Sequence, residues 1–146
     1  MKILVISNTT DERSGWGRYA TSVVEETRRR GIECVVLSNV GSVAPDGKIL
    51  SDEHPSLLEP FTISNAIKNI LYIRKFLKVK GGVDIIHAFD CWPFAVYAAI
   101  ATIGKGVPIF ITGIGTYSIP PRTSGSKSIL MQYAYCLLYT SDAADE

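Results

Sequence analysis

The sequence predicts an α/β domain with a doubly wound, mostly parallel sheet. Short, continuously apolar runs rich in β-branched residues recur along the chain, and such runs are typical of strands buried on both faces of a parallel sheet. Longer segments with helical periodicity separate these runs, and this alternation places helices on both faces of an open sheet. With 146 residues, of which 47% are apolar, the chain is long enough to bury one ordinary core.

The first third of the chain shows the alternation most clearly. Ile3–Ile6 has the pattern of a buried strand, Gly15–Arg30 that of a helix, and Cys34–Leu37 that of a second strand. The helix ends in three consecutive arginines followed directly by Gly31, which places cations at the negative end of the helix dipole and glycine at the C′ position. These segments predict one βαβ unit.

The middle of the chain is less regular. Residues 39–60 are rich in Gly, Ser, Pro and Asp, which predicts loops, with one weak strand candidate at Lys48–Leu50. Ile63–Val79 predicts a helix with one broad apolar face. The residues of that face are Ile63, Ile67, Ile70, Leu71, Ile73, Phe76 and Leu77.

Two further strands follow this helix. Gly81 and Gly82 end it, and Val83–Ala88 has the pattern of the next buried strand. Pro93, at an early helical position, is expected to open a helix that extends to Ile103. Val107–Thr112 is expected to be the last strand.

Composition excludes several classes of protein. The net charge of +1 argues against a protein that binds nucleic acid by neutralising phosphates. Cys34, Cys91 and Cys136 are odd in number and not spaced for zinc, which fits a reducing compartment. We find neither a secretory signal pattern nor a run of about 18 apolar residues. A cytoplasmic protein without a metal site is therefore expected.

Ligands of such sheets bind beyond the carboxyl ends of the strands, and three segments are expected there. The first is the glycine-containing loop Ser14–Tyr19, which opens a helix and offers backbone N–H groups to an anion. The others are His87–Asp90 and Gly113–Tyr117. We expect all three segments to lie on one edge of the sheet.

Two alternatives remain open for the glycine loop. Gly15 and Gly17 are also what a tight strand-to-helix turn requires, with no ligand involved. A nicotinamide-binding fragment is the other, but Ala20 stands at the last position of the glycine fingerprint and the second strand ends in Asn39. No acid is available there to hold a ribose hydroxyl.

The ordered set of motifs resembles the N-terminal domain of family-4 retaining glycosyltransferases of the GT-B fold. The motifs are S-G-W-G-R-Y, R-R-R-G-I-E-C-V-V-L, D-I-I-H-A-F-D-C-W-P and V-P-I-F-I-T-G-I-G-T-Y. The resemblance implies two Rossmann-like domains facing each other across a cleft. The N-terminal domain mainly binds the acceptor, and the C-terminal domain binds the nucleotide-sugar through a Glu-x7-Glu element.

This resemblance extends from Met1 to Tyr135, so residues 1–135 are expected to form the Rossmann-like N-terminal domain of an incomplete enzyme. Residues 136–146 resemble a translated sequencing-library adapter, which predicts a non-native tail. A natural helix end with an acidic tail is the alternative. On the first interpretation the natural chain continues past Tyr135, and the fragment alone is inactive.

By resemblance, the cleft is lined by residues from the three segments. These candidates for substrate or phosphate binding are Ser14, Gly15, Trp16, Gly17, His87, Asp90, Gly115, Thr116 and Tyr117.

His87 is the one catalytic candidate, as a contact to the acceptor hydroxyl, and a structural histidine is its alternative. For Asp90 we favour a helix cap over a sugar ligand. Phe89 and Ile114 stand where the family commonly has histidine, and isoleucine can neither donate to a phosphate nor accept a proton.

The implied partners are a nucleotide-diphosphate sugar as co-substrate, with no further cofactor, and a glycan, lipid-linked or small-molecule acceptor. The missing C-terminal domain is the third implied partner. A basic stretch with a strong apolar face suggests peripheral contact with the cytoplasmic membrane surface, although a solvated face of a packed helix is the more frequent origin of such a pattern. Its cations are Lys68, Arg74, Lys75, Lys78 and Lys80. A stand-alone module that binds a nucleotide or phosphorylated ligand remains the rival function.

Overall fold

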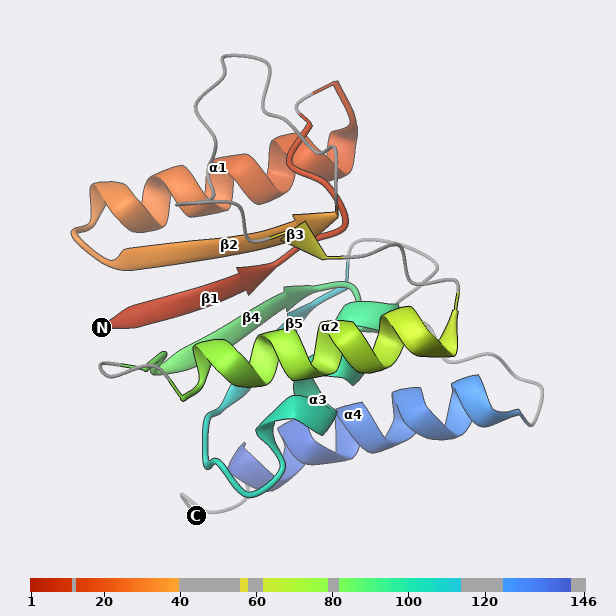
Figure 1. The fold of residues 1–146 in the computed structure, drawn as a ribbon. Helices are drawn as coiled ribbons and strands as arrows, with labels where there is room; N and C mark the ends of the chain where they lie inside the picture. Colours follow the sequence, from red (N-terminus) through yellow and green to blue (C-terminus); the bar gives the residue numbers. More distant parts are fainter. Residues whose placement is uncertain (12, 40–55, 58–61, 79–81, 114–124, 143–146) are drawn as a thin grey trace.

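A computed structural model describes residues 1–11, 13–39, 56–57, 62–78, 82–113 and 125–142 (Figure 1). The side chains of residues 56–57 and 137–142 are outside this description. The weak strand candidate Lys48–Leu50 also lies outside the described residues.

Five strands form one sheet in the order β3-β2-β1-β4-β5, and every pair is parallel. The strands are β1 (Lys2–Ile6), β2 (Glu33–Asn39), β3 (Ser56–Leu57), β4 (Ile85–Phe89) and β5 (Ile109–Thr112). The chain moves outward from β1 to one side and then returns to the other side through β4. This order confirms the predicted doubly wound α/β fold.

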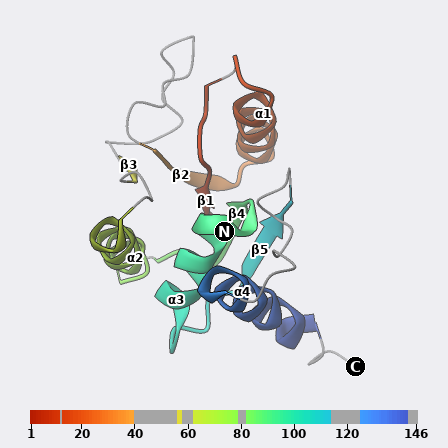
Figure 2. The same ribbon diagram turned by 90° about the vertical axis from the view of Figure 1, so that its right-hand side faces the viewer.

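Helices cover both faces of the sheet. They are α1 (Gly15–Arg29), α2 (Ile63–Phe76), α3 (Val96–Thr102) and α4 (Ser126–Asp142). Figures 1 and 2 show α1 on one face, whereas α2, α3 and α4 form a layer on the other. None of the helices in the described residues is long and apolar enough to cross a membrane.

The core is divided by the sheet because successive strand residues point to opposite faces. Val5 of β1 packs with Val24 of α1 and with Val36 of β2. Leu4 and Ile6 point the other way, into the core under α2 and α3. Strands with apolar residues on both faces are what the unbroken hydrophobic runs of the sequence predict.

The first helix ends as predicted. Gly31 has φ +78°, in the left-handed region that favours glycine, and its N–H donates to the carbonyl of Arg28 at 2.9 Å. Ser14 caps the other end, where its Oγ accepts the Gly17 N–H at 2.9 Å. The boundaries of α1 therefore follow from local capping chemistry.

The predicted helix from Pro93 to Ile103 forms differently. A five-residue π-type turn, η1 (Cys91–Ala95), comes first, and Trp92 inside it is not helical. The regular helix α3 begins only at Val96 and ends at Thr102. α4 was not among the predicted helices.

The apolar face predicted for α2 is corrected by the structure. Ile73 is fully buried, and Ile70, Phe76 and Leu77 pack partly against the same core. Three other members of that face are exposed instead, namely Ile63, Ile67 and Leu71. The helix is apolar around more of its circumference than one packing face can cover, so periodicity alone cannot tell which residues are buried.

Cys34 and Cys91 are buried among apolar side chains. Burial raises the pKa of the Cys34 thiol and raises that of Cys91 to about 11. Because the thiolate is the reactive form, both are unreactive core residues.

Gly17 and Gly15 give a matched test of the turn into α1. A Cβ on Gly17 would overlap the backbone carbonyl of Asp11, whereas no atom of the described residues lies within 4 Å of a Cβ on Gly15. We expect Gly17→Ala to lower the free energy of unfolding by about 1–3 kcal/mol through overpacking. Gly15→Ala should leave it unchanged or raise it by up to about 1 kcal/mol, since alanine favours helix. Urea denaturation measures both, and equal effects would contradict the close contact.

Candidate functional site

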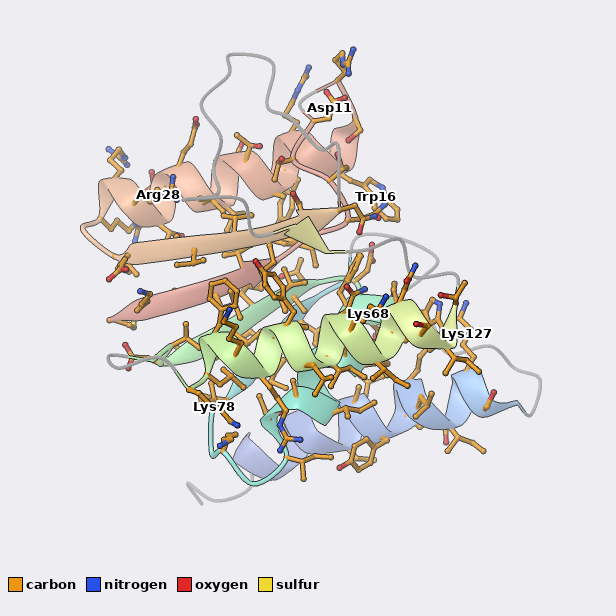
Figure 3. The ribbon with its side chains drawn as sticks, viewed as in Figure 1. Asp11, Trp16, Arg28, Lys68, Lys78 and Lys127 are labelled. Carbon is orange, nitrogen blue, oxygen red and sulfur yellow. The ribbon has the colours of Figure 1, made fainter. Side chains whose placement is uncertain are left out.

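The predicted site lies at the carboxyl edge of the sheet. The chain leaves β1 at this edge and enters α1 there, and β4 and β5 end on the same side (Figure 1). Ser14, Gly15, Trp16 and Gly17 stand at the start of α1, with Trp16 beside the strand ends (Figure 3). Asp90 directly follows β4. The predicted residues Gly115, Thr116 and Tyr117, together with Ile114, lie outside the described residues.

The loop between β1 and α1 is held by its own hydrogen bonds. Ser7 Oγ donates to the Thr9 carbonyl at 2.9 Å, and Thr9 Oγ1 accepts the Asp11 N–H at 3.0 Å. Thr21, from within α1, donates its hydroxyl to the Thr10 carbonyl at 3.3 Å. These bonds order the loop against α1 and fix the position of the helix start.

Asp11 and Arg13 form an exposed ion pair in this loop. Arg13 donates through Nε and Nη2 to both carboxylate oxygens of Asp11, with distances of 2.6 to 3.0 Å. Hydrogen bonds from Arg13 lower the pKa of Asp11 to about 2. The carboxylate therefore stays ionised and paired at neutral pH.

The two glycines at the start of α1 have different roles. Gly17 is required by the protein itself, because the Asp11 backbone packs against its Cα. Its N–H is also taken by the Ser14 cap. Gly15 faces open space, and nothing in the described residues would meet a side chain there. Thus the tight-turn explanation holds for Gly17, while Gly15 leaves room for a ligand to approach the backbone.

His87 lies on the face of the sheet that α1 covers, two residues before the end of β4. Its Nε2 is 2.8 Å from Thr112 Oγ1 across the β4–β5 pair. Its ring stacks on Phe89 with centroids 4.6 Å apart, and Tyr19 of α1 meets Phe89 edge-on at 5.7 Å. Tyr19, Phe89 and His87 therefore form an aromatic row from α1 across β4.

Burial lowers the pKa of His87 below its ordinary value, because the charged imidazolium loses solvation. The ring is therefore neutral at neutral pH and can share one hydrogen bond with Thr112. A neutral imidazole can accept a hydrogen bond from a hydroxyl group or donate one to it, but it brings no positive charge to the site.

The favoured assignment of Asp90 as a helix cap is wrong. Asp90 has φ +71° and ψ +147°, outside the conformation of a capping residue, and its side chain makes no capping hydrogen bond. Its N–H instead donates to the Thr112 carbonyl at 2.8 Å and extends the β4–β5 pairing. Asp90 is also buried. A residue other than glycine in this backbone region costs on the order of 1–3 kcal/mol, and such strained residues concentrate at functional sites.

Sequence reasoning missed one contact at this edge. Asn39, at the end of β2, donates through Nδ2 to Asn8 Oδ1 at 2.6 Å, which ties β2 to the loop after β1. From the sequence, Asn39 indicates only that no acid stands at the end of the second strand to hold a ribose hydroxyl. Polar side chains that directly follow neighbouring parallel strands are a signal for such a contact, because those ends meet at one edge.

The described residues contain no group of three or more His, Cys, Asp or Glu that could hold a metal ion. What they assemble is a helix N-terminus with open space at Gly15, beside neutral and polar side chains. An open parallel sheet with such an edge is a Rossmann-like ligand-binding domain.

The family follows from comparison with known proteins. Residues 13–141 match the sequence pattern of Glycosyltransferase Family 4, and the chain belongs to this family. No curated protein and no solved structure gives a significant match. The family match confirms the resemblance predicted from the motifs and identifies a glycosyltransferase-type domain.

The low pKa of His87 predicts a dependence of stability on pH. The folded chain takes up this proton at lower pH than the unfolded chain does, so the stability is complete above about pH 6.5 and declines as pH falls below it. His87→Gln should remove this part of the decline. Urea unfolding of both proteins between about pH 7.5 and pH 5.5 measures the difference, in which the contribution of His54 cancels. Identical pH dependence would show that His87 is solvated.

Proposed function

We propose that the full-length enzyme transfers a sugar from a nucleotide-diphosphate donor to an acceptor hydroxyl with retention of anomeric configuration. In this proposal residues 1–135 are the acceptor-side domain, and a second domain binds the donor. Membership of Glycosyltransferase Family 4 supports the transferase class. The donor, the acceptor and retention rest on the family resemblance of the motifs.

The single observation that carries the proposal is the open space at Gly15. The residue opens α1, where the helix dipole and backbone N–H groups favour a negative charge. Sugar transfer builds negative charge on the diphosphate oxygens, and donors that are already ordered stabilise that charge without reorganising. The hydrogen bonds of the loop after β1 provide this order.

A helix terminus contributes only about 0.3–1 kcal/mol to an exposed anion, so α1 assists and is not the whole catalyst. We assign no nucleophile in this domain. His87 is proposed as an acceptor contact, because a neutral ring at a strand end can hydrogen-bond a hydroxyl. Asp90 is proposed as a sugar ligand now that a capping role is removed. The Glu-x7-Glu element of the resemblance belongs to the second domain, so residues 1–135 alone should be inactive.

Turnover of the full-length protein tests the function. We expect release of a nucleoside diphosphate from a nucleotide-sugar only when an acceptor is present, and none from residues 1–135. A panel of UDP- and GDP-sugars with glycan, lipid-linked and small acceptors covers the proposed class. Tight binding of NADH with no effect of UDP or GDP would overturn the proposal in favour of a nicotinamide-binding domain.

Gly15→Val tests the role of the open space. Because a Cβ at Gly15 meets no atom of the described residues within 4 Å, the variant should fold normally, but its branched side chain fills the space in front of the helix. We expect kcat/KM to fall about tenfold or more, which corresponds to about 1.4 kcal/mol of transition-state stabilisation.

Steady-state kinetics on the full-length enzyme give this value. Ser22→Val, at an exposed position two turns further along α1, is the matched control and should leave kcat/KM unchanged. Normal activity of Gly15→Val would mean that no ligand approaches this helix start.

A further inference from the structure

The segments that form α2, α3 and α4 are almost free of acidic residues. The sequence has no Asp or Glu from Phe61 to Val83, and none from Cys91 to Ser141. These segments supply α2, α3 and α4 except for Asp142, the last residue of α4. Described cations in the layer are Lys68, Arg74, Lys75, Lys78, Lys105 and Lys127. At the end of α1, by contrast, Glu26 pairs with Arg29 at 2.7 Å and with Arg30 at 2.8 Å.

The outward face of α2 combines these cations with exposed aliphatic side chains. Ile63, Ile67 and Leu71 follow one another at intervals of four residues and are 82%, 53% and 59% exposed. At about 100° per residue, these three residues, the three cations of the helix and Lys78 just beyond its end fall within an arc of about 140°. The buried residue Ile73 lies outside this arc, toward the sheet. One half of α2 is therefore basic and apolar together and faces solvent (Figure 3).

A groove continues this face beyond α2. It has a volume of about 500 Å³ and is lined by Leu71, Lys75, Lys78, Arg74 and Lys105. Arg74 also lies 3.4 Å from the Ile103 carbonyl, which joins α2 to the turn after α3. Ile103 is itself 51% exposed. The basic and apolar surface thus spans two elements.

We propose that this surface, comprising the outward face of α2 and the turn at Ile103–Lys105, docks onto an anionic lipid bilayer. Lysines interleaved with exposed aliphatic residues match an interface of acidic headgroups over acyl chains. The absence of carboxylates from these segments removes repulsion from the anionic surface, and the cytoplasmic leaflet carries such a charge. A nucleic acid would use the cations but leave the isoleucines and leucine without a partner.

The orientation of α2 places the proposed docking surface beside the candidate site. The helix begins at the carboxyl edge of the sheet, where Thr62 caps it, and runs toward the opposite edge (Figure 1). A bilayer against its outward face would therefore lie beside the candidate site. On the proposed function, this places the acceptor side of the cleft within reach of a lipid-linked acceptor.

Vesicle flotation of the full-length protein tests the docking without any turnover. We expect the protein to float with vesicles containing phosphatidylserine or phosphatidylglycerol and to remain unbound with phosphatidylcholine alone. Lys75→Gln/Lys78→Gln should lower the partition coefficient about tenfold or more, since each lysine near an anionic surface adds to binding. Ile67→Ser/Leu71→Ser should lower it by a similar factor, and because both side chains are exposed the variant should fold.

The matched control is Arg29→Gln/Arg30→Gln, which removes the same charge from the opposite side of the sheet. It should float like the unchanged protein. Equal loss in both charge variants, or no binding to anionic vesicles, would overturn the proposal. Concentration-dependent dimerisation abolished by Ile67→Ser/Leu71→Ser, without flotation, would assign the surface to a second copy of the chain and also overturn it. Because flotation needs no catalysis, its failure leaves the transferase proposal intact.

Discussion

The central strand β1 is the constraint on which the other elements depend. It is hydrogen-bonded to β2 on one side and to β4 on the other. Its residues alternate between the core under α1 and the core under α2 and α3, and Leu4, Val5 and Ile6 are all at most 2% exposed. A strand buried on both faces and paired on both edges cannot shift its register without exposing one of these residue sets. The loop after Ile6 therefore begins at a fixed position on the carboxyl edge of the sheet.

From that point, short contacts set the geometry of the candidate site. The Asp11 backbone packs against Gly17 and the Ser14 cap closes the turn, so α1 begins directly over the strand ends. Phe89 completes the arrangement from β4. It stands where the family commonly has a second histidine, yet it is buried between Tyr19 and His87 and acts by packing. His87 and Phe89 bring no positive charge from β4, so the attraction of the site for anions comes from the helix start.

Local sequence signals predicted the elements whose chemistry is local. Continuous apolar runs gave the positions of β1 and β2, and Gly31 marked the end of α1, because strand burial and left-handed backbone leave clear residue preferences. Contacts that depend on register were beyond the sequence. The His87–Thr112 pair joins residues 25 positions apart. The positive φ of Asp90 could not be predicted because the residue is not glycine. The basic stretch of α2 was visible in the sequence, but helical spacing alone does not show that Ile63, Ile67 and Leu71 are exposed beside it.

The central claim is that ligands meet this domain at the start of α1. The most direct measurement uses full-length protein labelled with ¹⁵N at glycine and titrated with a nucleoside diphosphate and an acceptor. A groove of about 300 Å³ at the opposite edge, lined in part by Gly104 and Gly106, provides an internal comparison. The account predicts that the amide resonances of Gly15 and Gly17 shift while those of Gly104 and Gly106 stay in place. Shifts confined to Gly104 and Gly106 would contradict it and place binding at the amino edge of the sheet.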